Sequence, residues 1–368
     1  MTKKELQISM IAICAMFPMG SWADQATQAT SGYLQGEKVK NGQIPAGYNQ
    51  NAGYSVEDGH DVYFTADYIY WHLSNHVALG TSIVAPSLSS AALTTGVGND
   101  VGISPSYKSG FQVGMGLALK GMDDWNLYGE YTWYENNTSA SVEVAPGDIF
   151  IMTAGPLGNQ FIPLSVLADS VTGQSIFHYT TADLALQRNF YLGKKLTAKF
   201  GCGLRARWIH SKATVGATGL QIGAPSEAIS AYSVESGSLK YSFTQHSWAL
   251  GPRFELASNW LLGCGFRIMG DIAASILYTK YTNLDSYYKA GTAIDYANSD
   301  TGTARLRPIA ETSLGLGWGM YCGANNNYHF DFSAAYEFNV HWSQTYDIFG
   351  VADDIYLHGL NIAARFDF

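Results

Sequence analysis

The side chains of this sequence that could do chemistry are charged residues at alternate positions within long apolar and aromatic runs. Between Leu196 and Trp208 the even positions are apolar, whereas Lys199, Arg205 and Arg207 occupy odd positions. Successive side chains of a β-strand point to opposite faces, so these charges lie together on the face opposite the apolar residues. Such a face could orient ions or small polar solutes in a conduit, or it could fill an interior with salt bridges. The residues predicted to line a pore are Glu130, Asp183, Lys199, Arg205, Arg207, Arg253, Arg267, Asp271, Glu311 and Glu337, and the wider inward set adds Asp67, Lys120, Glu255, Arg307, Asp331 and Arg365.

The elements that must position these charges are ten segments of period-two alternation. From 111 to 120, for example, Phe111, Val113 and Met115 oppose Gln112 and Gly114. A tilted strand that crosses a bilayer needs about 9–11 residues, whereas strands of soluble proteins usually have about 5–6. The segments are longer than the soluble norm. The predicted strands are 62–73, 106–120, 125–136, 175–188, 196–210, 241–256, 260–280, 305–320, 328–342 and 354–368.

The connections between these segments alternate in length. The long connections are 74–105, 137–174, 211–240, 281–304 and 343–353, and the short ones are 121–124, 189–195, 257–259 and 321–327. Outer-membrane barrels have long extracellular loops and short periplasmic turns, and an even strand number returns both termini to the periplasm. We therefore predict an all-β fold, a transmembrane antiparallel up-and-down β-barrel of about ten strands. A further hairpin in 148–152 and 161–167 would make twelve.

The composition favours a barrel over a soluble enzyme or a helical bundle. Charged residues make up 14% of the chain and aromatic residues 14%, while the mean hydropathy is −0.04. Alternating strands give this neutral average, whereas membrane helices are apolar throughout. The run 261–278 resembles a membrane helix, but Arg267 and Asp271 would then lie in lipid at a cost of several kcal/mol. The formal net charge of −9 argues against nucleic acid as a partner.

The N-terminus predicts export. Lys3 and Lys4 precede a short apolar segment, and small residues flank Trp22, so residues 1–23 are predicted to be a cleaved signal peptide. Residues 24–60 are predicted to be either a flexible periplasmic segment or a plug, and residues 61–368 the barrel. The remaining cysteines are interpreted as small apolar fillers, their redox state left open: Cys202, Cys264 and Cys322.

Histidines gather near the predicted extracellular strand ends. The five that parity turns outward are His72, His178, His210, His246 and His358. A metal-binding rim is one interpretation, but we do not expect outward residues on separate strands to converge on one ion. We interpret these residues as interfacial polar aromatics. Since Cys and His show no metal-ligand spacing either, we predict no metal and no cofactor.

The predicted extracellular rim also holds candidates for acid–base catalysis. Asp353, Asp354 and His341 are the candidates for an acid–base pair, but no spacing distinguishes them, and neither GxSxG nor HExxH occurs. We therefore predict that the protein is not an enzyme. An outer-membrane hydrolase of the omptin type is the least favoured alternative.

Several motifs resemble the Legionella-type major-outer-membrane-protein-like family, which also occurs in chlamydia-related bacteria. They are Ser109–Gly114 with Asp124–Tyr128, Gly203–Ile209, Gly251–Arg253, Asp271–Ser275 and the ending Arg365–Phe368. The resemblance covers about residues 61–368 and implies a pore-forming outer-membrane protein. The terminal Phe368 is similar to the signal that the barrel-assembly machinery reads.

The predicted function is a porin-like pore in the bacterial outer membrane for small hydrophilic solutes or ions. The alternative is a surface-exposed structural or adhesin barrel with a packed interior, since the long loops suit display. Expected partners are outer-membrane lipid, the assembly machinery and the solutes, and a homo-oligomer is compatible with the sequence.

Overall fold

The structure is a computed structural model that describes residues 51–54, 56, 62–74, 77–83, 98–103, 105–119, 124–143, 149–152, 164–166, 170–220, 237–290, 294–323, 327–346 and 352–368. The expected signal peptide, most of 24–60 and Lys120 lie outside these residues. Within them, no helix is long and apolar enough to cross a membrane.

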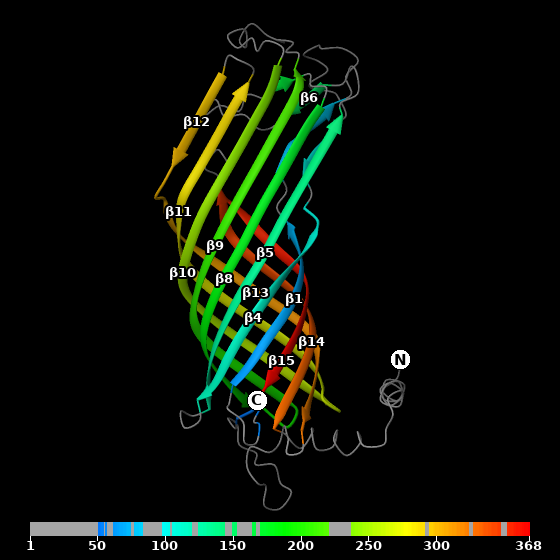
Figure 1. The fold of residues 1–368 in the computed structure, drawn as a ribbon, viewed down its shortest axis with the longest axis vertical. Coiled ribbons are helices and arrows are strands. Elements are labelled where there is room, and N and C mark those ends of the chain that lie inside the picture. The colour runs from blue at the N-terminus through cyan, green and yellow to red at the C-terminus, as the bar shows by residue number, and fades with distance from the viewer. Residues whose placement is uncertain are drawn as a thin grey trace, which may run out of the picture.

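Ten antiparallel strands form a closed, tilted barrel (Figure 1). Each pairs with its neighbours in chain order, and β1 pairs with β15 from Tyr63 opposite Asp367 to Ser74 opposite Tyr356. This last pairing closes the barrel and confirms the predicted fold class. The barrel strands are β1 (Val62–Ser74), β4 (Tyr107–Leu119), β5 (Trp125–Glu143), β8 (Ser170–Tyr191), β9 (Leu196–Leu220), β10 (Gly237–Gly263), β11 (Phe266–Ala290), β13 (Ala304–Cys322), β14 (Tyr328–Tyr346) and β15 (Ala352–Asp367).

The remaining strands lie toward the end of the barrel that bears the long connections, which we call the loop end; the opposite end is the turn end. There β12 (Ile294–Asp300) pairs with the last part of β11. The strands β2 (Val77–Ile83), β3 (Gly98–Ile103), β6 (Ile149–Met152) and β7 (Leu164–Val166) form a separate sheet in the order β3-β2-β6-β7. The hairpin considered within 148–167 therefore forms, but it adds no strand to the barrel.

Strands β5 and β8 to β11 continue well beyond the predicted segments at the loop end (Figure 1). The prediction also misplaced one turn. Residues 257–259 belong to β10, and the chain reverses at Gly263, Cys264 and Gly265, whose φ angles are 110°, 54° and 79°. Glycine adopts positive φ without steric cost, which explains why the turn lies here. Cys264 is exposed in this turn and is not the predicted apolar filler, whereas Cys202 and Cys322 are half-buried.

The two faces of the barrel wall differ sharply in chemistry. On β9, Leu204 is 55% exposed on the outside, whereas the next residue, Arg205, is 4% exposed on the inside. The same parity runs along β10, where Phe254 faces outward and Arg253 inward. The predicted orientation of these alternating residues is confirmed.

Candidate functional site

The barrel encloses a cavity of about 340 Å³, which we call the charged chamber. Every barrel strand contributes to its wall, because the inward parity of each strand carries polar residues at this level. Its lining includes Asp67, Glu130, Lys199, Asp271 and Glu337 among the ionisable groups.

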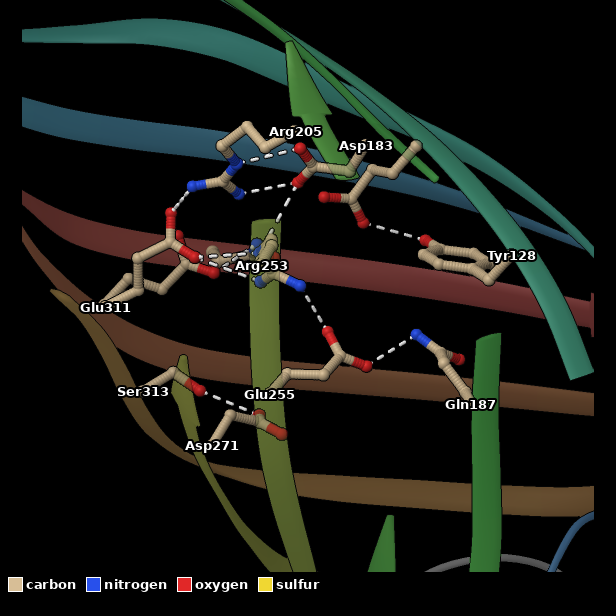
Figure 2. Close-up of polar contacts among 12 residues, drawn as sticks. Tyr128, Asp183, Gln187, Arg205, Arg253, Glu255, Asp271, Glu311 and Ser313 are labelled. Atoms are coloured by element: carbon tan, nitrogen blue, oxygen red, sulfur yellow. Dashed lines mark hydrogen bonds and ion pairs between the residues drawn. The ribbon is translucent and has the colours of Figure 1, made fainter. Parts of the chain in front are cut away.

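Two arginines organise one side of the chamber (Figure 2). Arg205 donates from Nε to Asp183 Oδ1 at 2.8 Å and from Nη2 to Oδ2 at 2.6 Å, and its third nitrogen, Nη1, pairs with Glu311. Arg253 donates from Nη2 to Glu311 Oε2 at 3.0 Å and also pairs with Glu255. Glu311 therefore joins both arginines across the lumen.

The pairing register of neighbouring strands explains some of these ion pairs, and the closure of the barrel explains the others. Asp183 and Arg205 are directly opposite on β8 and β9, so their pairing follows from the ladder. Glu311 comes from β13 and reaches Arg205 only because the sheet closes on itself. Lys199 Nζ completes the network at 3.3 Å from Glu255 Oε1. Buried charges of this kind need partners, since an unpaired one is strongly destabilising.

The acidic residues on the other side have neutral donors. Glu337 accepts from Trp71 Nε1 at 3.0 Å and from Asn361 Nδ2 at 2.8 Å, and Glu130 accepts from Tyr128 at 2.8 Å. Asp67 accepts from Asn361 through one oxygen, while the other, Oδ1, is buried with no hydrogen-bond partner among the described residues. The chamber thus has arginines concentrated on one wall and carboxyl groups with neutral donors on another.

A layer of large side chains covers the chamber toward the loop end; we call it the apolar layer. It consists of Ile69, Trp71, Leu73, Tyr134, Phe177, Tyr179, Ile209, Ile355 and Leu357, all nearly inaccessible. Arg207 is 1% exposed and donates to Thr279 and Gln344, with His341 Nδ1 at 3.2 Å from its Nη1. At this level the interior is packed.

A short segment before the first strand covers the chamber toward the turn end. Asn51 forms an antiparallel bridge with Phe190, and the amide of Ala52 donates to the carbonyl of Asn189 at 3.3 Å. Tyr54 stacks on His329 with ring centroids 3.8 Å apart and donates its hydroxyl to Asp331 Oδ2 at 3.2 Å.

The partners of Tyr54 are themselves held by ion pairs. Arg267 donates to both carboxylate oxygens of Asp331, at 2.5 and 2.7 Å, and the Arg365 guanidinium lies 4.9 Å from the Tyr54 ring. Asp367 binds Arg365 and His329. Tyr54 therefore contacts polar side chains that ion pairs already hold in place.

The structure brings nine of the ten predicted pore-lining residues to the chamber wall. Arg207 is the exception, because it lies above the chamber beside the apolar layer.

The sequence reasoning missed the apolar layer, although Tyr68 to Leu73 is apolar on both faces apart from His72. This loss of alternation could have indicated that the inward side chains at this level are apolar. Nothing in the residue pattern of 51–56 indicated the capture of Tyr54.

The candidate catalytic residues at the rim do not come together. His341 is fully buried and faces Arg207, whereas Asp354 accepts hydrogen bonds from the Ser343 amide and the Tyr356 hydroxyl. Asp353 is exposed. The described residues therefore do not assemble the acid–base pair considered from the sequence.

The outer wall is apolar between two levels of aromatic rings. Leu314, Ile272 and Leu204 are more than half exposed along its middle. Exposed rings lie near both ends: Trp260, Tyr328 and Phe366 at the turn end, and Trp208, Trp248 and Tyr278 at the loop end. A closed wall of this kind satisfies every backbone group within lipid and places amphipathic rings at both interfaces. Together with the polar interior, it defines a transmembrane β-barrel of the outer-membrane class.

A family model described as Legionella pneumophila major outer membrane protein precursor matches residues 60–353. The chain belongs to this family of outer-membrane proteins, as the sequence resemblance indicated. No curated protein matches the chain.

Solved structures of other outer-membrane proteins share a distant likeness. The toluene transporter TodX of Pseudomonas putida is 10% identical, with 85% of this chain and 91% of that chain covered and a TM-score of 0.29. The outer-membrane protease OmpT of Escherichia coli is 11% identical, with coverage of 83% and 96% and a TM-score of 0.30. OprG of Pseudomonas aeruginosa is 12% identical, with coverage of 83% and 97% and a TM-score of 0.25.

Proposed function

We propose that this protein is a narrow pore for ions and small hydrophilic solutes, with the charged chamber on its conduction path. The observation that carries the proposal is the chamber itself, a cavity of about 340 Å³ lined by charges of both signs within a membrane wall. Arginines and carboxyl groups on separate walls would hold a permeating solute by its own charges. The membership of an outer-membrane family agrees with this function.

The chamber is covered at both ends, and these coverings must move for the pore to conduct. Trp71 and Tyr179 belong to both the apolar layer and the chamber wall, so movement of this layer connects the chamber to the loop end. Ala52, Gly53 and Tyr54 line the opposite end. A ten-stranded barrel lies near the size at which side chains fill the interior, and open aqueous channels are typical at about 16–18 strands. We therefore expect small and infrequent conductance steps from the natural chain.

Conductance in planar bilayers tests the proposal. We expect Trp71→Ala to conduct more than the natural protein, because it removes the largest ring between the chamber and the loop end. Trp208→Ala is the matched control, since the same residue type there faces outward and is 48% exposed. If the natural protein and Trp71→Ala are both silent at high protein density, the pore proposal fails.

Tyr54 allows an independent test at the turn end. Tyr54→Ala removes both the stacking on His329 and the hydrogen bond to Asp331, whereas Tyr54→Phe keeps the ring. We expect longer open times for the alanine variant and a smaller change for the phenylalanine variant. Equal open times in all three proteins would show that this segment does not limit conduction.

The second candidate is a structural or adhesin barrel with a packed interior, which the apolar layer specifically favours. Silent membranes with a correctly folded protein are its expected result. A hydrolase has the least support, because the rim residues that would supply acid–base chemistry lie apart.

A further inference from the structure

Three histidines form a row on the outer wall near the loop end. His178 on β8 is directly opposite His210 on β9, which is directly opposite His246 on β10. All three have outward parity, and His210 and His246 follow the same face as Trp208 and Trp248, two residues away on each strand. Neighbouring strands place opposite residues about 5 Å apart across the ladder, so outward histidines on adjacent strands can lie side by side.

Two of these rings present nitrogen atoms to each other. His210 Nδ1 lies 3.2 Å from His246 Nδ1, and the ring centroids are 4.1 Å apart. The His178 ring is farther away, with its centroid 5.5 Å from that of His210, and its Nε2 lies 3.7 Å from Glu135 Oε1. The pair of facing nitrogens is therefore specific to His210 and His246.

Facing nitrogens at this distance match two ligands of one metal ion. Zinc binds imidazole nitrogen at about 2.0–2.1 Å with tetrahedral geometry, which separates two such nitrogens by about 3.3 Å. We infer that His210 and His246 form a binding site for a divalent metal ion of the zinc class on the outer wall. Among the described residues, no group of three or more His, Cys, Asp or Glu side chains could hold a metal ion. Two imidazoles therefore supply the protein ligands, and water completes the coordination.

A second outward histidine pair shows that histidines opposite each other on neighbouring strands do not by themselves form a metal site. His72 and His358 are opposite each other on β1 and β15, with ring centroids 5.1 Å apart. Their nitrogens contact hydroxyl groups instead: His358 Nδ1 lies 2.6 Å from Tyr336, and Ser74 Oγ is 3.2 Å from His72 Nδ1 and 3.3 Å from His358 Nε2. This pair has the same residue type on the same outer face, so it is a matched control.

Calorimetric titration of the refolded full chain with zinc chloride tests the site. The protein should carry no histidine tag and should be kept in detergent micelles. We expect saturable binding of one zinc ion per chain, with affinity reduced more than about tenfold by His210→Gln and by His246→Gln. His358→Gln should leave the affinity unchanged. Absence of binding, retention in both ligand variants, or an equal loss in His358→Gln would overturn the proposal.

Chemical protection gives a readout that needs no variant. Zinc should shield His210 and His246 of the natural chain from diethyl pyrocarbonate, with modification located by mass spectrometry. His72 and His358 should react equally with and without zinc. If zinc protects neither His210 nor His246, or protects all four histidines alike, the site is absent. Both readouts are independent of conduction, so their outcome leaves the pore proposal untouched.

Discussion

Inside the barrel, glycines lie beside the largest polar side chains of neighbouring strands. A Cβ on Gly317 would come within 2.5 Å of Arg267 Cζ, and one on Gly201 within 2.5 Å of Glu255 Cγ. Real Cβ atoms do not approach so closely, so these positions provide room for side chains that make the chamber's ion pairs. The glycines around residues 201 and 315 alternate with other residues within their strands, and the structure shows which groups they accommodate.

At the residue scale, we predict that Gly317→Val destabilises the barrel by about 3 kcal/mol. The new side chain would displace the Arg267 guanidinium from Asp331, which is 5% exposed, and breaking a buried pair typically costs about 3–5 kcal/mol. Urea unfolding of the refolded protein in micelles measures the change. Gly270→Val is the control, because a Cβ there meets no atom nearer than 3.7 Å. Equal stabilities of the two variants would contradict this role of Gly317.

At the scale of single elements, each strand separates lipid from the chamber. On β11, Ile272 is 57% exposed on the outer wall, while the next residue, Ala273, lines the chamber opposite Glu255 and Glu311. The alternation that predicted the strands is local, and it depends only on the side-chain period of an extended backbone. All ten predicted barrel strands therefore form.

This alternation predicts opposite outcomes for an arginine at adjacent positions of β11. Ile272→Arg should reduce the free energy of unfolding by about 2–4 kcal/mol, as expected for arginine at the bilayer midplane. Ala273→Arg should be much milder, since the new charge enters the chamber between two carboxylates. Unfolding titrations in lipid vesicles compare the two. A larger effect at residue 273 would mean that the chamber has no room for the side chain.

The ends of the elements were less predictable than their existence. The prediction ended the strand from residue 196 at residue 210, but β9 continues to Leu220, and β10 begins at Gly237 rather than residue 241. These extensions pair with each other, as Ala217 does with Leu239. In the extension of β9 the apolar residues change parity. Ala213, Val215 and Ala217 occupy odd positions, which explains why the pattern of apolar even positions stopped short.

For the whole molecule, closure depends on pairing between the first and last barrel strands. Phe64 lies directly opposite Phe366 in this pairing, and both face outward. Because opposite residues have Cβ atoms about 4.5–5.5 Å apart, cysteines at these positions should form a disulfide on oxidation. The native cysteines would first be replaced by serine.

We predict that the Phe64→Cys/Phe366→Cys protein cross-links within one chain and changes its mobility on a non-reducing gel. Phe64→Cys/Leu360→Cys is the control, since it is six residues out of register, or about 20 Å along the strand. Efficient cross-linking in the control, or none in the opposite pair, would contradict the register that closes the barrel.

The sequence by itself determined the strands, their inward and outward faces and the membership of the family. Each depends on local alternation or on motifs within single strands. Only the tertiary structure decided that Glu311 joins Arg205 to Arg253, that Tyr54 covers the turn end, and that His210 meets His246. The physical reason is that parity assigns a side chain to a face but not to a level, and contacts across a lumen or between strands require the register of a closed sheet.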